Sequence, residues 1–225
     1  MKKQAVRDRI EETGIIAAVR VSSEEDAIFV AEALVKGGIP VVEIPLTVPQ
    51  ATGVIAHLVK RIPGIIVGAG GVRLLSSARK CLEAGAKFLT SDGLHPAVIE
   101  FAAQEEIVSI PGALTPTEVM AAWEAGSDFV KLVPCAHIGG HDYILSLNAM
   151  FPHIPLIAAG GVNQVNASKF IIAGAAGLGI GRELMPADAI RHRKPDRIGE
   201  LARRFLGFVK TGRDHLAART ARGAR

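Results

Sequence analysis

Eight short apolar runs recur along the chain, and stretches of helical character separate them. The runs cover residues 14–19, 39–46, 64–72, 87–91, 107–114, 129–134, 155–162 and 177–181. Their apolar residues are continuous rather than alternating, which is typical of strands buried on both faces of a parallel sheet. Eight strand–helix units in one chain predict an α/β fold with a single (β/α)8 TIM barrel.

Four glycines follow predicted helices and precede apolar runs. Gly37, Gly85, Gly126 and Gly174 are separated by 48, 41 and 48 residues, or about two strand–helix units each. An open, doubly wound sheet is the main alternative, but the evenly spaced units favour a closed barrel and no GxGxxG motif opens the chain. We therefore expect one domain over residues 1–225, with its core at about residues 10–210.

Ser23 and Thr115 mark two of the clearest predicted helix starts. Ser23 precedes three acidic residues, which suit the first turn of a helix because they complement its dipole. Thr115 precedes Pro116, and proline is well accommodated at the first helical position, where its missing N–H costs nothing.

Basic residues gather at the C-terminal end of the chain. The formal net charge is +4, but residues 191–225 hold eleven basic and three acidic residues, so the rest of the chain carries −4. Ile198, Leu201 and Phe205 lie at helical spacing, and we expect a basic last helix followed by a frayed tail at 211–225. Few aromatic residues accompany these charges, so we expect no nucleic-acid partner.

The cysteine count and the hydropathy pattern bear on the compartment. Cys81 and Cys135 are too few for a disulfide framework, which favours a reducing environment. No apolar run approaches the ~18 residues of a spanning helix, so no membrane partner is expected. Residues 1–14 mix both charge signs and lack the apolar stretch of a secretory signal. We therefore expect a cytoplasmic protein.

In a (β/α)8 barrel the active site lies at the C-terminal ends of the strands. Ionisable residues and glycines stand at several of these predicted ends, although the strands themselves are apolar. The candidate site residues are Arg20, Glu43, Gly70, Gly71, Asp92, Lys131, Gly160, Gly161, Gly181 and Arg182.

Lys131 and Glu43 are the candidates that suggest a reaction. Lys131 lies inside the apolar run 129–134, and lysine is rarely buried without a reason. A desolvated lysine favours its neutral amine, which suits imine formation with a carbonyl, whereas a lysine at a strand end can extend its ammonium to solvent. Glu43 lies inside the apolar run 39–46 and suits a general acid or base, or a structural partner for Lys131 or Arg20.

Glycines follow the last two predicted strands. Barrel enzymes often hold phosphate on backbone N–H groups of the loops after these strands. The residues at these positions are Gly160 and Gly161 after one strand, and Gly181 and Arg182 after the other. The alternative is a pair of tight turns that need positive φ angles.

Histidines near these loops do not form a metal motif. His137 and His141 lie close to Cys135, but no HxH, HExxH or CxxC pattern accompanies them. We therefore expect no metal site.

Six stretches of the chain, taken together and in order, match a known pattern. They are AAVR at 17–20, VEIPLTVP at 42–49, GAG at 68–70, IPGALTPTE at 110–118, VKLVP at 130–134 and AGGVN at 159–163. With these stretches the chain resembles the KDPG/KHG aldolase family. These are class I, Schiff-base aldolases that act on 2-keto-3-deoxy-6-phosphogluconate (KDPG), 4-hydroxy-2-oxoglutarate (KHG) and related 2-oxo acids.

The resemblance implies a role for several candidate residues. Lys131 would form the imine with the C2 carbonyl, and Glu43 would shuttle protons. Arg20 would contact the pyruvate end of the substrate, and Gly160 and Gly161 would help to hold its phosphate. The resemblance also implies a cytoplasmic homotrimer, pyruvate as a bound product, and no cofactor apart from the covalent imine on Lys131.

The chain departs from the family's usual pattern around the substrate. Gly71 and Ala159 stand where the family usually has threonines, and Thr47 where some members have an arginine. Asp92 and Arg182 add charge where the family commonly has proline and serine. The residues for imine formation are thus retained, while those that read the substrate are changed.

We therefore predict a carbon–carbon lyase of carbohydrate metabolism. It would cleave a KDPG-like, phosphorylated 2-keto-3-deoxy sugar acid or 4-hydroxy-2-oxoglutarate to pyruvate and an aldehyde. One alternative is the same imine chemistry on a different 2-oxo acid. Another is a catalytically silent barrel that serves as a binding protein.

Overall fold

Nine parallel strands form one sheet within residues 1–223, the part of the chain that this computed structural model describes; side chains are described through residue 218. The strands are β1 (Ile15–Ala18), β2 (Val41–Pro45), β3 (Ile66–Gly70), β4 (Phe88–Thr90), β5 (Val108–Ile110), β6 (Gly112–Ala113), β7 (Val130–Leu132), β8 (Leu156–Ala159) and β9 (Gly177–Ile180). Their order in the sheet is β5-β4-β3-β2-β1-β9-β8-β7-β6.

The sheet closes through β5 and β6, which are two parts of one predicted strand. Pro111 separates them, because proline has no N–H for a ladder hydrogen bond. β5 pairs with β4 through Thr90 and Ile110, while β6 pairs with β7 through Gly112 and Lys131. The eight predicted strands therefore form an eight-unit barrel, and the TIM-barrel prediction is confirmed.

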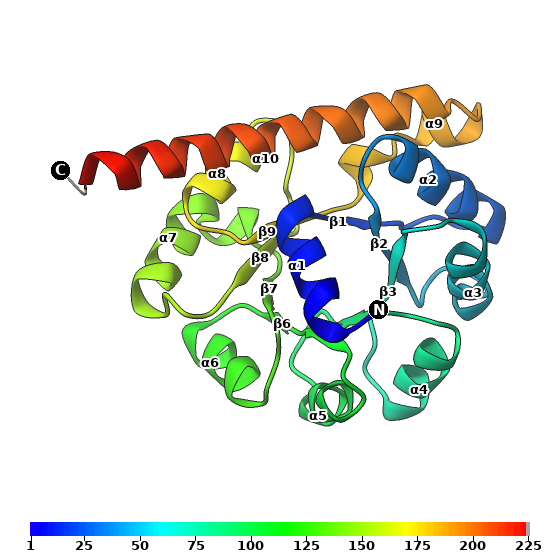
Figure 1. The fold of residues 1–225 in the computed structure, drawn as a ribbon, viewed down its shortest axis with the longest axis horizontal. Helices are drawn as coiled ribbons and strands as arrows, with labels where there is room; N and C mark the ends of the chain where they lie inside the picture. The colour runs from blue at the N-terminus through cyan, green and yellow to red at the C-terminus, as the bar shows by residue number, and fades with distance from the viewer. Residues whose placement is uncertain (224–225) are drawn as a thin grey trace.

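Helices surround this barrel (Figure 1). They are α1 (Lys3–Thr13), α2 (Glu24–Lys36), α3 (Ala51–Arg61), α4 (Leu75–Glu83), α5 (Pro96–Gln104), α6 (Pro116–Glu124), α7 (Gly140–Met150), α8 (Ala167–Ile172), α9 (Ala187–Arg191) and α10 (Pro195–Gly223). Two 3-10 turns, η1 (Ala136–Ile138) and η2 (Arg182–Leu184), follow β7 and β9. None of the described helices is both long and apolar enough to cross a membrane.

The predicted helix starts at Ser23 and Thr115 are confirmed. The backbone N–H of Asp26 donates to Ser23 Oγ at 3.1 Å, which caps α2. Thr115 and Glu118 form a reciprocal capping box at the start of α6, so backbone donors of the first turn are satisfied.

Helix α1 covers the N-terminal end of the barrel, where it lies across the middle of the ring in Figure 1. Its Val6 and Ile10 are buried and pack with Phe88 and Phe129 inside the barrel. Ordered structure that contributes to the core therefore begins before residue 10, where we had placed the core boundary.

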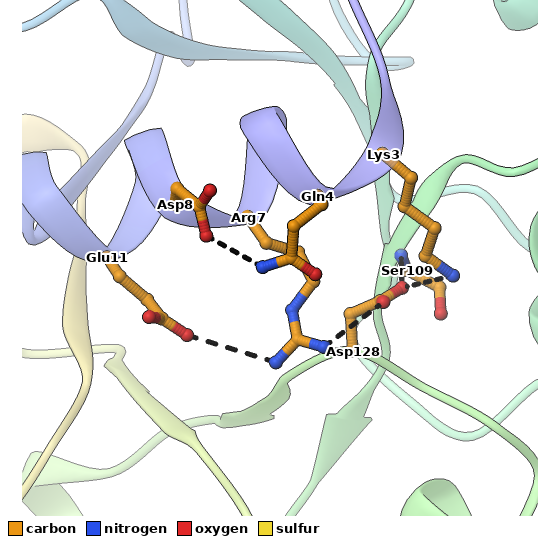
Figure 2. A network of polar contacts seen from close by, with 7 residues as sticks. All are labelled: Lys3, Gln4, Arg7, Asp8, Glu11, Ser109 and Asp128. Atoms are coloured by element: carbon orange, nitrogen blue, oxygen red, sulfur yellow. Dashed lines mark hydrogen bonds and ion pairs between the residues drawn. The ribbon is translucent and has the colours of Figure 1, made fainter.

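A polar network joins α1 to the barrel (Figure 2). Asp128, just before β7, is buried and accepts a hydrogen bond from the backbone N–H of Ser109 at 2.9 Å. The Lys3 ammonium of α1 lies 3.0 Å from the Asp128 carboxylate, and the Arg7 guanidinium lies 4.0 Å from it. Because the partners come from α1 and two strand ends, this network fixes the helix over the barrel.

Helix α10 packs across α8 and α2 along one side of the molecule (Figure 1). The guanidinium of Arg213 donates hydrogen bonds to the backbone carbonyls of Glu11 and Glu12 in α1. Gly212 lies so close to Ile171 of α8 that a side chain there would overlap it. These contacts show that α10 is packed at 212 and 213, where we had expected a frayed tail from 211, and the helix itself runs to Gly223. Residues 224–225 lie outside the described part.

Candidate active site

The C-terminal ends of the strands surround a hollow of about 750 Å³. Its lining includes eight of the ten predicted site residues, which are Arg20, Glu43, Asp92, Lys131, Gly160, Gly161, Gly181 and Arg182. The prediction placed these residues at different strand ends, and the barrel brings them into one hollow.

Gly70 and Gly71 line a neighbouring hollow of about 580 Å³ instead. Arg20 and Asp92 border both hollows. A side chain at Gly70 would overlap the carboxylate of Glu43, so this glycine makes room for Glu43. At Gly71 the φ angle is +71° and a Cβ would meet nothing within 4 Å, so the turn requires the left-handed backbone but leaves open space.

Lys131 lies in the middle of β7 and is 5% exposed. Its backbone is held by β6 on one side and β8 on the other, which fixes the position of its Cα. The ammonium Nζ donates a hydrogen bond to Asp92 Oδ1 at 2.8 Å. Because Lys131 also lines the hollow, its nitrogen is both enclosed by protein and available to a molecule bound there.

Glu43 lies on β2 and is also buried. The Thr90 hydroxyl, at the end of β4, donates to Glu43 Oε2 at 2.7 Å. This contact orients the carboxylate, and its other oxygen, Oε1, lies on the side of Gly70. Glu43 therefore offers an acid–base group to the same hollow as Lys131.

Asp92 stands on the loop after β4 and faces a group of cations. Arg20 lies 3.9 Å from its Oδ2, in addition to the bond from Lys131. Burial raises the pKa of Asp92, but the charge and hydrogen bond of Lys131, with the charges of Arg20 and Arg73, outweigh it. The pKa of Asp92 therefore lies below the ordinary value, and the carboxylate is ionised near neutral pH.

Gly160 and Gly161 adopt φ angles of +78° and +86°, so both interpretations of these glycines stay open. A side chain at Gly160 would clash with Pro134, and one at Gly161 with Ala136. The tight turn therefore requires glycine, while the same residues line the hollow where a ligand could reach their backbone.

The helix after this turn, α8, starts at Ala167. The side chains of Asn163 and Asn166 form hydrogen bonds within the loop before it. The amide of Asn166 donates to the Gly161 carbonyl at 2.9 Å and its Oδ1 accepts from the N–H of Asn163 at 2.7 Å. These bonds hold the loop that carries both glycines.

Sequence reasoning missed several residues of this region. Thr90 supports Glu43, and His137, Asn163 and Glu183 line the hollow. Arg73 acts on Asp92 from the neighbouring hollow. Thr90 directly precedes the predicted strand end at Ser91, and Asn163 ends the matched stretch AGGVN, so both positions were usable signals. No sequence pattern marked His137 and Glu183, which lie in the two 3-10 turns, or Arg73.

The histidines and cysteines of this region bear on metal binding and thiol chemistry. Among the described residues, no three histidine, cysteine or acidic side chains group closely enough to hold a metal ion. Burial raises the pKa of Cys135 to about 12, so this thiol stays protonated near neutral pH.

A model of the KDPG and KHG aldolases matches residues 6–201 of the chain. The chain belongs to this family. A probable 2-dehydro-3-deoxy-6-phosphogalactonate aldolase of Rhizobium meliloti is 34% identical over 188 residues, which cover 81% of this chain and 88% of that protein. The KHG/KDPG aldolase of Escherichia coli is 31% identical over 196 residues, which cover 87% of this chain and 92% of the other.

Among solved structures, the KDPG aldolase of Legionella pneumophila, with pyruvate captured as a covalent carbinolamine, superposes with a TM-score of 0.81. It is 28% identical and the match covers 88% of this chain and 96% of that one. As a member of the family, the chain is an aldolase, a carbon–carbon lyase. The names of these relatives give different substrates. Family membership therefore does not specify the substrate, which depends on the residues that line the hollow.

Proposed function

We propose that this aldolase cleaves a phosphorylated, KDPG-like 2-keto-3-deoxy sugar acid or 4-hydroxy-2-oxoglutarate through an imine on Lys131. The observation that carries the proposal is the enclosed Lys131 nitrogen, which opens on the same hollow as the carboxylate of Glu43. The carbinolamine captured in the Legionella relative supports the same chemistry here.

In this mechanism the neutral Lys131 amine attacks the C2 carbonyl, and loss of water leaves an iminium ion. Glu43 takes the proton of the C4 hydroxyl as the C3–C4 bond breaks, and the bonding electrons flow into the iminium. The resulting enamine is protonated at C3 and hydrolysed to pyruvate. The reaction uses no cofactor other than this covalent imine.

Arg20 and the loops after β8 and β9 would hold the two ends of the substrate. Arg20 borders the hollow on the side of Asp92, where it would orient the carboxylate of the 2-oxo acid. Gly160, Gly161 and Gly181, with the exposed Arg182, would hold a distal phosphate.

Borohydride trapping with pyruvate tests the imine. We expect reduction to add the mass of the trapped pyruvate to the peptide that contains Lys131. The Lys131→Arg variant keeps the positive charge and forms no imine, so it should show no adduct. A wild-type protein without added mass at Lys131 would overturn the mechanism.

A different 2-oxo acid is a second candidate substrate, because the open space beside Gly71 enlarges the neighbouring hollow. Steady-state cleavage of phosphorylated and unphosphorylated substrates separates the two. If Arg182 holds phosphate, Arg182→Ala should raise KM about tenfold for the phosphorylated substrate alone, which corresponds to ~1.4 kcal/mol. An equal effect on both would contradict that role, and imine formation without turnover would indicate a binding protein.

We also propose that the protein is a cytoplasmic homotrimer, as the family resemblance suggests. Leu74 and Val165 are 65% and 77% exposed, and an interface would remove such apolar surface from water. Sedimentation of the purified protein measures the oligomeric state, and a monomer at micromolar concentration would contradict the proposal.

A further inference from the structure

We propose that Asp92 is a further catalytic residue, the base that takes a proton from the Lys131 ammonium when the substrate binds. The inference rests on the proposed function, since it concerns the step that makes Lys131 nucleophilic. An ammonium has no lone pair, so a proton must leave Nζ before C2 can be attacked.

The geometry places Asp92 at the reacting atom. Its Oδ1 lies 2.8 Å from Nζ of Lys131, a distance suited to direct proton transfer. The Lys131 side chain is 7% exposed while that of Asp92 is 54% exposed, so the carboxylate connects the enclosed nitrogen with the open hollow. Of the described carboxylates, that of Asp92 alone forms an ion pair with Lys131. The carboxylate of Glu43, by contrast, accepts a hydrogen bond from the Thr90 hydroxyl.

Local contacts hold the Asp92 loop in this position. The Ser91 hydroxyl donates to the Gly93 carbonyl at 2.7 Å and so links the two residues that flank Asp92. Gly112 of β6 lies against the Asp92 backbone so closely that any side chain at 112 would overlap it. Since β6 also pairs with β7 at Lys131, the same glycine aligns both partners of the ion pair.

The charges around Asp92 explain why the proton moves only when substrate is present. In the free protein Lys131, Arg20 and Arg73 all face Asp92 and favour its ionised form. A 2-oxo acid brings its carboxylate within a few Å of Nζ, because that group is bonded to the carbon under attack. When Arg20 pairs with this carboxylate, the Arg20 charge no longer stabilises ionised Asp92, and the negative substrate carboxylate lies near it. Both changes raise the affinity of Asp92 for a proton.

The step balances without any external reagent. The proton moves from Nζ to Oδ1 of Asp92, and the freed electron pair of Nζ forms the bond to C2. The C2–O π electrons move to oxygen, which takes the proton from Asp92 and leaves a carbinolamine whose nitrogen is still protonated. Asp92 thereby returns to its ionised form for the next turnover. Transfer of the remaining proton from nitrogen to the hydroxyl releases water and gives the iminium ion.

The test is the rate of borohydride-trapped adduct formation with pyruvate, measured from about pH 6 to pH 9 on folded protein. Asp92→Asn keeps a hydrogen-bond acceptor for Nζ but removes the base, so trapping should slow about 100-fold near pH 7. The difference in trapping rate between Asp92→Asn and the wild type should become smaller as pH rises, because hydroxide then removes the proton from the Lys131 ammonium. Asp92→Glu should recover most of the rate.

Asp128→Asn is the matched control, since it removes a carboxylate paired with a lysine toward the other end of the barrel. It should trap pyruvate at the wild-type rate. Equal rates for Asp92→Asn and wild type would overturn the role of Asp92 while leaving the imine intact, as would a deficit that is constant with pH. Wild-type protein that forms no adduct would instead overturn the proposed function itself.

Discussion

Two lysine–aspartate pairs lie near strand β7, one toward each end of the barrel, and the pairs differ in their surroundings. Before the strand, the side chain of Asp128 is 6% exposed and lies beneath helix α1, where it contacts Lys3 and the backbone of Ser109 (Figure 2). Within the strand, the buried member is Lys131, and its partner Asp92 is 54% exposed beside the hollow.

This difference separates a structural pair from a chemical one. At the α1 end, the buried charge has a second hydrogen bond and its partner belongs to a helix that closes the barrel. At the hollow, the buried group is the nucleophile and its partner stands on a loop open to a ligand. Removing a charge from the Asp128–Lys3 pair should therefore lower the free energy of unfolding, whereas removing one from the Asp92–Lys131 pair should slow imine formation.

The largest expected effect is at Lys131. Lys131→Met replaces a buried ammonium by an apolar chain of similar length and leaves Asp92 half-exposed to water. We expect no pyruvate adduct by mass spectrometry and a free energy of unfolding within about 1 kcal/mol of the wild type. A strongly destabilised variant would show that this pair also supports the fold.

Next is the apolar contact of α1 with the barrel. Ile10 is fully buried among the side chains that fill the barrel. Ile10→Ala should reduce the free energy of unfolding by about 2–5 kcal/mol, measured in urea, because it leaves a cavity. Trapping of pyruvate by the folded fraction should be unchanged, and a slower rate would contradict the separation of the two ends.

The Asp128 pair should have a smaller effect on stability. Asp128→Asn removes the charge that faces Lys3, and we expect a loss of about 1–3 kcal/mol in urea denaturation. The matched change Asp92→Asn, at a carboxylate that water reaches, should cost less than about 1 kcal/mol. If the two variants lose equal stability, the contrast between the two pairs fails.

The smallest effect is expected at Thr115, which caps α6 on the side of the hollow but does not line it. Thr115→Ala should reduce the free energy of unfolding by about 1 kcal/mol and leave the rate of pyruvate trapping unchanged.

Backbone hydrogen bonds from Thr115 and Leu114 hold the pKa of Glu118 below its usual value. The contribution of Glu118 is therefore present above about pH 4.3 and is lost as pH falls through its lower folded pKa.

Denaturation of Glu118→Gln and wild type at several pH values checks that sign. The wild type should have the larger free energy of unfolding near neutral pH, and this difference from the variant should disappear only in acid, below the pKa of an unfolded glutamate. A gap that widens in acid would contradict the assignment of these hydrogen bonds.

Much of the fold and part of the candidate site were predictable because they depend on local patterns. Short continuous apolar runs are typical of strands in a parallel sheet, and their regular recurrence led to the barrel. Lys131 and Glu43 stood out because each is an ionisable residue inside such a run. The N-terminal helix was missed as part of the core, since its segment reads as polar and only Val6, Ile10 and Thr13 of α1 are buried.

The sequence by itself determined the order of the strands and which of them carry ionisable side chains. Only the tertiary structure decided which of those side chains meet. Lys131 and Asp92 are 39 residues apart, and Glu43 and Thr90 are 47 apart. Their contacts depend on the register of neighbouring strands and on the close approach that Gly112 and Gly70 allow. Because the stagger of each strand in a closed barrel is linked to the tilt and number of all the strands, no single stretch of sequence specifies these pairs.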